Sequence, residues 1–284
     1  MEIKELKIKC EDLLNESVSE IKIIQGGDIS QSYQIETLQN IYFCKTNTSS
    51  IGKDLLVKEE VGLRAIQRYC RTPNIIKSAP ELLLLSWVRS GKKSKPFWEE
   101  LGRSLAALHQ VTSNKFGFEH RNYIGSLLQN NEQKDSWNEF YTTQRLMPQF
   151  QLAKDKGLLT AYEIPKAETV AKAVNKVCPH EVASLVHGDL WSGNIMCGVE
   201  NEAFFIDPCV SYAHREMDIA MSSLFGKFDQ AFYDSYHEIY PLEEGWKARL
   251  DIYQLYYLLA HLNMFGIGYK NDVLKISQRY FTKT

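Results

Sequence analysis

Hydrophobic and polar residues follow a helical pattern in some stretches of the first ninety positions and a strand pattern in others. Near the N-terminus apolar residues recur every third or fourth position, which predicts an amphipathic helix because those side chains share one helical face. Alternating apolar and polar residues then predict three strands, and a longer helical pattern follows at residues 55–69. A continuous apolar run at residues 82–85 predicts a fully buried strand. The three alternating strands are expected at residues 21–24, 32–38 and 41–46.

From about residue 97 onward the helical pattern dominates, with two short strand-like runs that each end at a polar or acidic cluster. The polar, glycine-containing segment 89–93 separates the two parts. We therefore expect an α+β fold with a small antiparallel-sheet N-terminal lobe at residues 1–88, containing one main helix, and a larger, mostly α-helical C-terminal lobe at residues 89–284. The helices are expected at residues 97–109, 137–152, 163–177, 215–224 and 246–265, and the strands at residues 184–186 and 203–206.

Composition narrows the class of partner. At 284 residues the chain is long enough for two lobes that share a cleft, and 44% hydrophobic residues can fill a sizeable core. A formal net charge of -2 gives no general attraction for nucleic acid or for an anionic membrane. The basic run Lys92, Lys93 and Lys95 is expected to be a solvated loop without a function of its own.

The N-terminal segment, the lack of a long apolar run and the cysteines predict where the protein is located. The N-terminus has no apolar segment typical of a secretory signal, and no window approaches the roughly 20 apolar residues that a bilayer span requires, so we expect a cytoplasmic protein. The six cysteines show no zinc-ligand spacing and are expected to be small buried residues in a reducing compartment.

The strongest chemical signal is the segment His187-Gly188-Asp189-Leu190-Trp191-Ser192-Gly193-Asn194, directly after a predicted strand. Thirteen residues beyond Asn194, the next strand-like run ends at Asp207. Phosphoryl transfer needs one carboxylate to orient the attacking hydroxyl and accept its proton, and oxygen ligands that hold magnesium on the ATP phosphates. We therefore expect Asp189 as the catalytic base, Asn194 and Asp207 as Mg²⁺ ligands, and ATP with Mg²⁺ as cofactors. An isolated Asp in a loop is more often a turn former, but the joint spacing argues against that interpretation.

The N-terminal half offers matching candidates for the nucleotide. Gly26, Gly27 and Ser30 lie between two predicted strands, where a phosphate-covering loop needs small residues, although an ordinary hairpin turn would look the same. Lys45 ends the third strand, and a lysine that faces inward there requires anions such as the α- and β-phosphates. A glutamate on the following helix should orient this lysine, and both Glu59 and Glu60 are candidates on position alone.

These residues resemble the fructosamine kinases, also called ketosamine-3-kinases, which are relatives of aminoglycoside phosphotransferases and choline kinases with a bilobal protein-kinase-like fold. The 187–194 string is similar to the signature of that family, and the resemblance covers nearly the whole chain. It includes residues 26–33, Asn122-Tyr123-Ile124-Gly125-Ser126, Gln129, Asn131, Trp137, Phe140, Arg145-Leu146, Ile206-Asp207-Pro208 and Arg215-Glu216-Met217-Asp218.

The resemblance implies an enzyme that phosphorylates ketosamines, of ribulosamine or fructosamine type, at the 3-hydroxyl of the sugar in a deglycation role. It favours Glu59 as the partner of Lys45, and it suggests Trp191 as a flat apolar face for the sugar-amine, with core packing as the alternative. By the same resemblance, Asp218 would brace the catalytic loop through backbone hydrogen bonds and Glu216 would form a salt bridge. Independently of the resemblance, His187 is expected to be structural and to brace the loop rather than move protons.

Two other functions remain open at this point. The same phosphate machinery would serve a kinase of another hydroxylated amine, such as an aminoglycoside or choline. A catalytically silent kinase-like binding protein is the alternative from a different class, although such a chain would be free to lose Lys45, Glu59, Asp189, Asn194 and Asp207. The preferred sugar and amine, free or protein-linked substrate, and the oligomeric state are not determined by the sequence.

Overall fold

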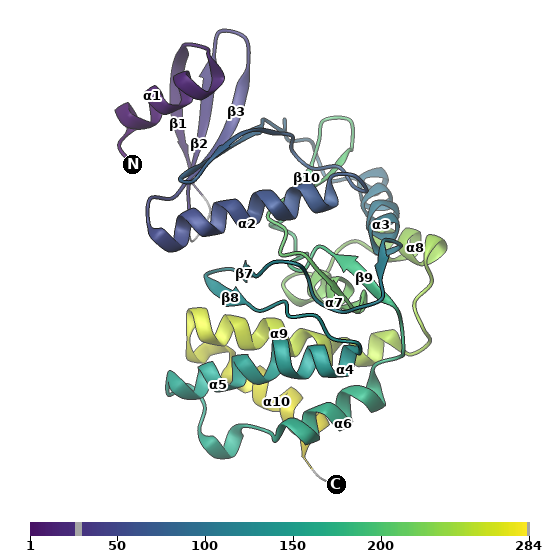
Figure 1. The fold of residues 1–284 in the computed structure, drawn as a ribbon. Coiled ribbons are helices and arrows are strands. Elements are labelled where there is room, and N and C mark those ends of the chain that lie inside the picture. The colour runs from purple at the N-terminus through teal and green to yellow at the C-terminus, as the bar shows by residue number, and fades with distance from the viewer. Residues whose placement is uncertain (26–29, 283–284) are drawn as a thin grey trace.

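The computed structural model describes residues 1–25 and 30–282. The N-terminal part is built on a five-stranded antiparallel sheet with the strand order β1-β2-β3-β5-β4, of which Figure 1 labels β1, β2 and β3. The alternating pattern predicts β1, β2 and β3, and the continuous apolar run predicts β5, whereas β4 was not among the predicted elements. The strands are β1 (Val18–Ile24), β2 (Gln31–Thr37), β3 (Ile41–Thr46), β4 (Ile75–Ala79) and β5 (Leu82–Ser86).

Two helices accompany this sheet, α1 (Ile3–Leu14) and α2 (Ser50–Ile66). Leu82 and Leu84 of β5 pack in one apolar cluster with α1, while Leu83 and Leu85 pack in another with α2. Because neighbouring side chains of a strand point to opposite faces, burial on both sides explains the uninterrupted leucine run.

The remaining chain is mainly helical and forms the larger part of the molecule (Figure 1). The predicted helix at residues 137–152 is continuous but contains a π-helical segment, and two helices, α8 and α10, were not predicted. The helical elements are α3 (Lys95–His109), α4 (Trp137–Phe140), η1 (Tyr141–Leu146), α5 (Met147–Asp155), η2 (Ala161–Glu163), α6 (Ala167–Val177), α7 (Glu216–Leu224), α8 (Gln230–Ile239), α9 (Trp246–Phe265), η3 (Ile267–Tyr269) and α10 (Lys270–Phe281).

Short strands form the framework between the lobes. A three-stranded sheet has the order β12-β9-β6, and two hairpins pair β10 with β11 and β7 with β8. Strand β9 leads directly into His187, and the β10–β11 hairpin connects Asn194 to Asp207. The strands are β6 (Thr112–Ser113), β7 (Asn122–Ile124), β8 (Leu127–Gln129), β9 (Ala183–Val186), β10 (Ile195–Cys197), β11 (Ala203–Phe205) and β12 (Ser211–Ala213).

Two expectations about composition can be compared with the structure. All six cysteines are buried and unpaired, which confirms their prediction as small core residues. Within residues 1–25 and 30–282, no helix combines the length and the apolar character that crossing a bilayer would need.

Candidate active site

The loop between β9 and β10 has a backbone that only glycine suits at one position. Gly188 has φ +85°, and a Cβ atom there would lie 2.0 Å from the carbonyl oxygen of Cys209. The two segments are tied together by the hydrogen bond from the Cys209 amide to the His187 carbonyl, at 2.8 Å. Any side chain at position 188 would force apart the loop and the segment that follows Asp207.

Two buried side chains brace this loop, as predicted. The carboxylate of Asp218 accepts hydrogen bonds from the backbone amides of His187, at 2.7 Å, and Gly188, at 2.8 Å. The His187 ring lies 2.9 Å from the Ile206 carbonyl through Nε2 and accepts a bond from the Asp189 amide at Nδ1, which requires the neutral tautomer with its proton on Nε2. Burial also lowers the pKa of His187, which favours this neutral form of the ring. Glu216 forms the predicted salt bridge, with Arg249.

Asp189 and Asn194 meet at the end of the loop. The Asn194 amide nitrogen donates to the Asp189 carboxylate at 2.9 Å and to the Asp189 carbonyl at 2.8 Å. Burial raises the pKa of Asp189 to about 7 and outweighs the opposing hydrogen bond from Asn194, while the carboxylates of Asp207 and Asp218 raise it further. A carboxylate with a pKa near neutrality suits proton transfer at physiological pH.

A second group lies on the N-terminal side, where Lys45 joins two acids. Its Nζ is 2.8 Å from Glu59 and also contacts Asp207 directly. Burial opposes the charge on Lys45, but the two carboxylates outweigh it and raise the lysine pKa. Asp207 keeps a lowered pKa because Lys45 outweighs the effect of burial, whereas burial raises the pKa of Glu59 to about 7. Asp207 also has φ +54°, a left-handed backbone conformation that is unusual outside glycine and concentrates at functional sites.

The two groups are coupled through the backbone. The Ile206 amide donates to the Asn194 carbonyl at 3.1 Å, so Asp207, the next residue, lies close to Asn194. The negative charge of Asp207 also contributes to the raised pKa of Asp189. Lys45, Glu59, Asp189, Asn194 and Asp207, which are up to 162 residues apart in sequence, thus come together where the two lobes meet.

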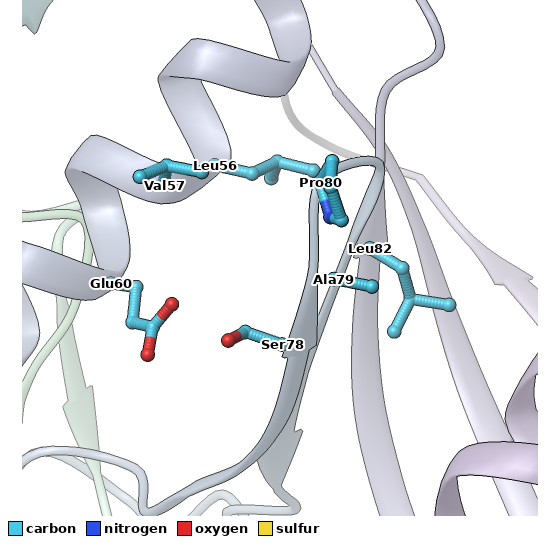
Figure 2. Close-up of a pocket in the computed structure, with 7 residues that line it drawn as sticks. All are labelled: Leu56, Val57, Glu60, Ser78, Ala79, Pro80 and Leu82. Carbon is cyan, nitrogen blue, oxygen red and sulfur yellow. The ribbon is translucent and has the colours of Figure 1, made fainter.

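The choice between Glu59 and Glu60 is decided by their positions on α2. Glu60 turns away from Lys45, forms an ion pair with Arg64 at 2.7 Å, and lines a hollow of about 200 Å³ between α2 and the β4–β5 turn. Figure 2 shows its carboxylate facing Ser78 across that hollow, with Leu56 and Val57 on the same helix. None of the five converging residues lines this hollow, so it is separate from the candidate active site.

The remaining predicted site residues are Trp191, Ser30, Gly26 and Gly27. Trp191 is 36% exposed, so core packing does not account for it, and its ring lies against the backbone of Gly193. Ser30 lies immediately before β2, while Gly26 and Gly27 fall outside the residues that the structure describes.

One contact was not anticipated from the sequence. Lys93, which belongs to the basic run expected to be solvated, donates to the Ser192 carbonyl at 3.1 Å, and its Nζ lies 5.7 Å from the centre of the Trp98 ring. This contact ties the segment between the lobes to the loop that carries Trp191. A charge run alone carries no signal for such a contact.

Comparison with solved structures defines the class first. A complex of an aminoglycoside phosphotransferase with streptomycin and ATP superposes with a TM-score of 0.67 at 14% identity, over 98% of this chain and 97% of that one, so the two share a fold. The chain is a phosphotransferase of the protein-kinase-like fold. A putative fructosamine-3-kinase from Thermobifida fusca is more similar, with a TM-score of 0.88 at 28% identity over 98% of both chains.

Sequence comparison then identifies the family. The model that describes fructosamine kinases matches residues 4–283. A probable ketoamine kinase of Enterococcus faecium is 40% identical over 267 residues, which cover 90% of this chain and 94% of that protein. The chloroplastic protein-ribulosamine 3-kinase of Arabidopsis thaliana is 36% identical over 275 residues, or 93% and 83% of the two proteins. The chain therefore belongs to the fructosamine kinase family of ATP-dependent phosphotransferases, which confirms the resemblance noted in the sequence.

Proposed function

We propose that this protein transfers the γ-phosphoryl group of ATP to the 3-hydroxyl of a ketosamine, the adduct of a sugar with an amine. The observation that carries the proposal is the convergence of Lys45, Glu59 and Asp207 beside Asp189, whose pKa of about 7 suits a general base. The names of the Arabidopsis and Thermobifida relatives, a ribulosamine 3-kinase and a putative fructosamine-3-kinase, support both the class of acceptor and the position of transfer.

In this proposal the residues of the chain divide the reaction among them. Asp189 orients the sugar hydroxyl and accepts its proton as the oxygen attacks the γ-phosphorus. The new oxygen–phosphorus bond forms while the bond from the γ-phosphorus to the bridging oxygen breaks, and ADP leaves. Lys45, held by Glu59, contacts the α- and β-phosphates, and Gly26, Gly27 and Ser30 cover them. Trp191 offers an exposed aromatic face to the sugar-amine.

The residues present fit a magnesium ion. Mg²⁺ prefers oxygen ligands, keeps several waters, and is commonly held by one or two carboxylates together with substrate phosphates. Asp207 offers a carboxylate that is 40% exposed, and Asn194 offers an amide oxygen that accepts no hydrogen bond from any residue in the described part of the chain. Within that part no three His, Cys, Asp or Glu side chains are arranged to hold a metal alone, which agrees with a cation shared with the nucleotide. Bound Mg²⁺ would neutralise charge that develops on the phosphates.

The lobes would then have separate tasks. We place the nucleotide between residues 1–88 and residues 89–284, with the acceptor bound mainly by the C-terminal lobe. The positions of Lys45 and Glu59 in the first part and of Asp189, Asn194 and Asp207 in the second support this division.

The test is ATP turnover with a panel of acceptors. Purified protein is assayed with synthetic ribulosamine, fructosamine, choline and an aminoglycoside, and ³¹P and ¹³C NMR locate the phosphate in the product. The proposal predicts turnover of a ketosamine with phosphate on the sugar 3-oxygen. Turnover of only choline or the aminoglycoside, or phosphate at another position, would overturn it.

A further inference from the structure

The β7–β8 hairpin carries a motif that the phosphoryl-transfer site does not use. It spans Asn122–Ile124 and Leu127–Gln129, and Figure 1 shows it between helix α2 and the helices of the C-terminal lobe. Two neighbouring residues of the hairpin, Asn122 and Tyr123, make polar contacts in opposite directions, as consecutive residues of a strand do. One contact reaches the segment that follows Asp207, and the other reaches the helix that carries Glu59.

The contact with the C-terminal lobe is buried and fixed. The Asn122 amide nitrogen donates to the Val210 carbonyl at 2.7 Å, three residues after Asp207. The Asn122 side-chain oxygen accepts from both Gln129, at 2.8 Å, and Asn131, at 2.9 Å. With its donor and its acceptor both engaged and only 6% of its surface exposed, Asn122 has one available orientation.

The contact with the N-terminal lobe is a single hydrogen bond to a charged group. The Tyr123 hydroxyl donates to the Asp54 carboxylate at 2.7 Å. Burial and this carboxylate raise the pKa of Tyr123 to about 12, so the hydroxyl keeps its proton over the physiological range. A charge-assisted hydrogen bond of this length is among the stronger polar contacts in proteins.

Helix α2 transmits this contact to the lysine. Asp54 and Glu59 are five residues apart on one rigid helix, which is a rise of about 7.5 Å. Further along, Gly62 approaches the Asp207 segment so closely that a Cβ atom there would lie 3.0 Å from the Pro208 carbonyl oxygen. Glu59 therefore lies between two points where the C-terminal lobe contacts the helix.

Beside the β4–β5 turn, α2 borders a hollow. The hollow of about 200 Å³ in Figure 2 separates Val57 and Glu60 from the β4–β5 turn. Leu56 packs against β5, whereas Val57 and Glu60 border this hollow, so α2 has room beside the β4–β5 turn and a shift there would move Glu59 with it.

We propose that the β7–β8 hairpin is an interlobe clamp, in which Tyr123 is a positioning residue that holds α2, and through it the Lys45–Glu59 pair, at a fixed distance from Asp207. This inference rests on the proposed function, because it assigns Lys45 and Glu59 to the nucleotide. The chemistry itself stays with the residues that contact ATP and the acceptor.

The experiment is a double-mutant cycle of Tyr123→Phe with Glu59→Gln, read out as kcat/KM for ATP and KM for the acceptor. Loss of one hydrogen bond to a charged group should lower kcat/KM for ATP about 10-fold in the otherwise native enzyme, with little change in the acceptor KM. In the Glu59→Gln background the same change should cost less than 2-fold, because the pair that the clamp positions is already broken.

Two further variants keep the inference falsifiable. Asp54→Ala, which removes the acceptor, should reproduce the loss of Tyr123→Phe, and the two together should lose no more than either alone. Tyr162→Phe, at a fully exposed tyrosine of the C-terminal part, is the matched control and should leave ATP kinetics unchanged. Additive losses, an equal rise in the acceptor KM, or native kinetics in Tyr123→Phe would overturn the clamp. If Glu59→Gln alone has native kinetics, the proposed nucleotide site fails and the clamp fails with it.

Discussion

The two halves of the candidate active site are stabilised in different ways. The loop that carries Asp189 is held by backbone hydrogen bonds to fully buried groups, since Asp218 receives two amides and His187 bridges the loop to Ile206. The side that carries Lys45 is held by side-chain ion pairs with Glu59 and Asp207. Asp189, the proposed base, is thus held by the fold itself, whereas in the proposed reaction Lys45 would exchange its carboxylate contacts for phosphate oxygens of the nucleotide.

This difference predicts the largest effect at the base. Replacing Asp189 with Asn removes the proton acceptor and should lower kcat by roughly 10³-fold or more, while the dissociation constant of ATP changes little. Steady-state kinetics with a ketosamine and calorimetric titration of ATP measure the two quantities. Loss of ATP binding in parallel with kcat would instead place Asp189 in the nucleotide site.

The same variant should be more stable than the native chain. The pKa of Asp189 is raised from 3.8 to about 7, so the folded state binds a proton that the unfolded state releases between these values, and the ionised native carboxylate destabilises the fold above pH 7. Asp189→Asn should therefore raise the midpoint of thermal unfolding by roughly 2–4 °C at pH 8 and by less at pH 5. A lower midpoint at pH 8 would contradict the raised pKa.

Replacement of Lys45, in the proposed nucleotide half of the site, should lower activity less than replacement of Asp189 does. Lys45→Met should lower kcat/KM for ATP by about 10²–10³-fold, because the phosphates lose their fixed positive charge and two acids remain unpaired. Lys53→Met is the matched control, since Lys53 lies on α2 with a 42% exposed side chain paired to Glu81. Similar losses in both variants would mean that the effect arises from general charge rather than from the site.

The pH dependence of kcat/KM for the acceptor tests the half of the site that carries Asp189. Since Asp189 must be ionised to accept a proton and its pKa is raised to about 7, kcat/KM for the acceptor should fall about tenfold per unit of pH below 7 and level off above it. Initial rates between pH 5 and pH 9 test this. An acidic limb centred near pH 4 would show that the carboxylate is not perturbed.

The smallest effect is expected at Trp191, the proposed aromatic contact for the sugar-amine. Trp191→Leu should raise the acceptor KM about tenfold and leave the ATP KM unchanged, because only the aromatic face is lost. Trp98→Leu, at the ring that lies near Lys93, is the control for loss of a tryptophan. A changed ATP KM in Trp191→Leu would argue against a role on the acceptor side.

The sequence predicted that His187, Asp189 and Asn194 share one loop because these residues are close together in the chain. His187, Asp189 and Asn194 lie within one turn-rich segment after a strand, so their spacing alone indicates a shared site. The bracing role of Asp218 came from family resemblance, and the structure confirms the contacts. Glu59 and Glu60 could not be separated by position, since adjacent helical residues differ by about 100° in direction and the phase of α2 depends on tertiary packing.

Other features lay beyond pattern analysis for physical reasons. The strands β7 and β8 have three residues each, too few for a periodicity to be recognised. The π-helical segment at Tyr141–Leu146 adds residues to a turn and shifts the apolar face, which a regular helical pattern cannot anticipate. The hydrogen bond from Tyr123 to Asp54 joins residues 69 positions apart and is created by the fold alone.

The most direct test of the shared site is the effect of Mg²⁺ on ATP binding. ATP is titrated calorimetrically into the native protein and into Asp207→Asn, with Mg²⁺ and with chelator. Mg²⁺ should strengthen ATP binding at least tenfold in the native protein, and Asp207→Asn should lose this gain while it retains metal-free binding. An undiminished gain in Asp207→Asn would contradict a magnesium nucleotide held between Lys45 of one lobe and Asp207 of the other.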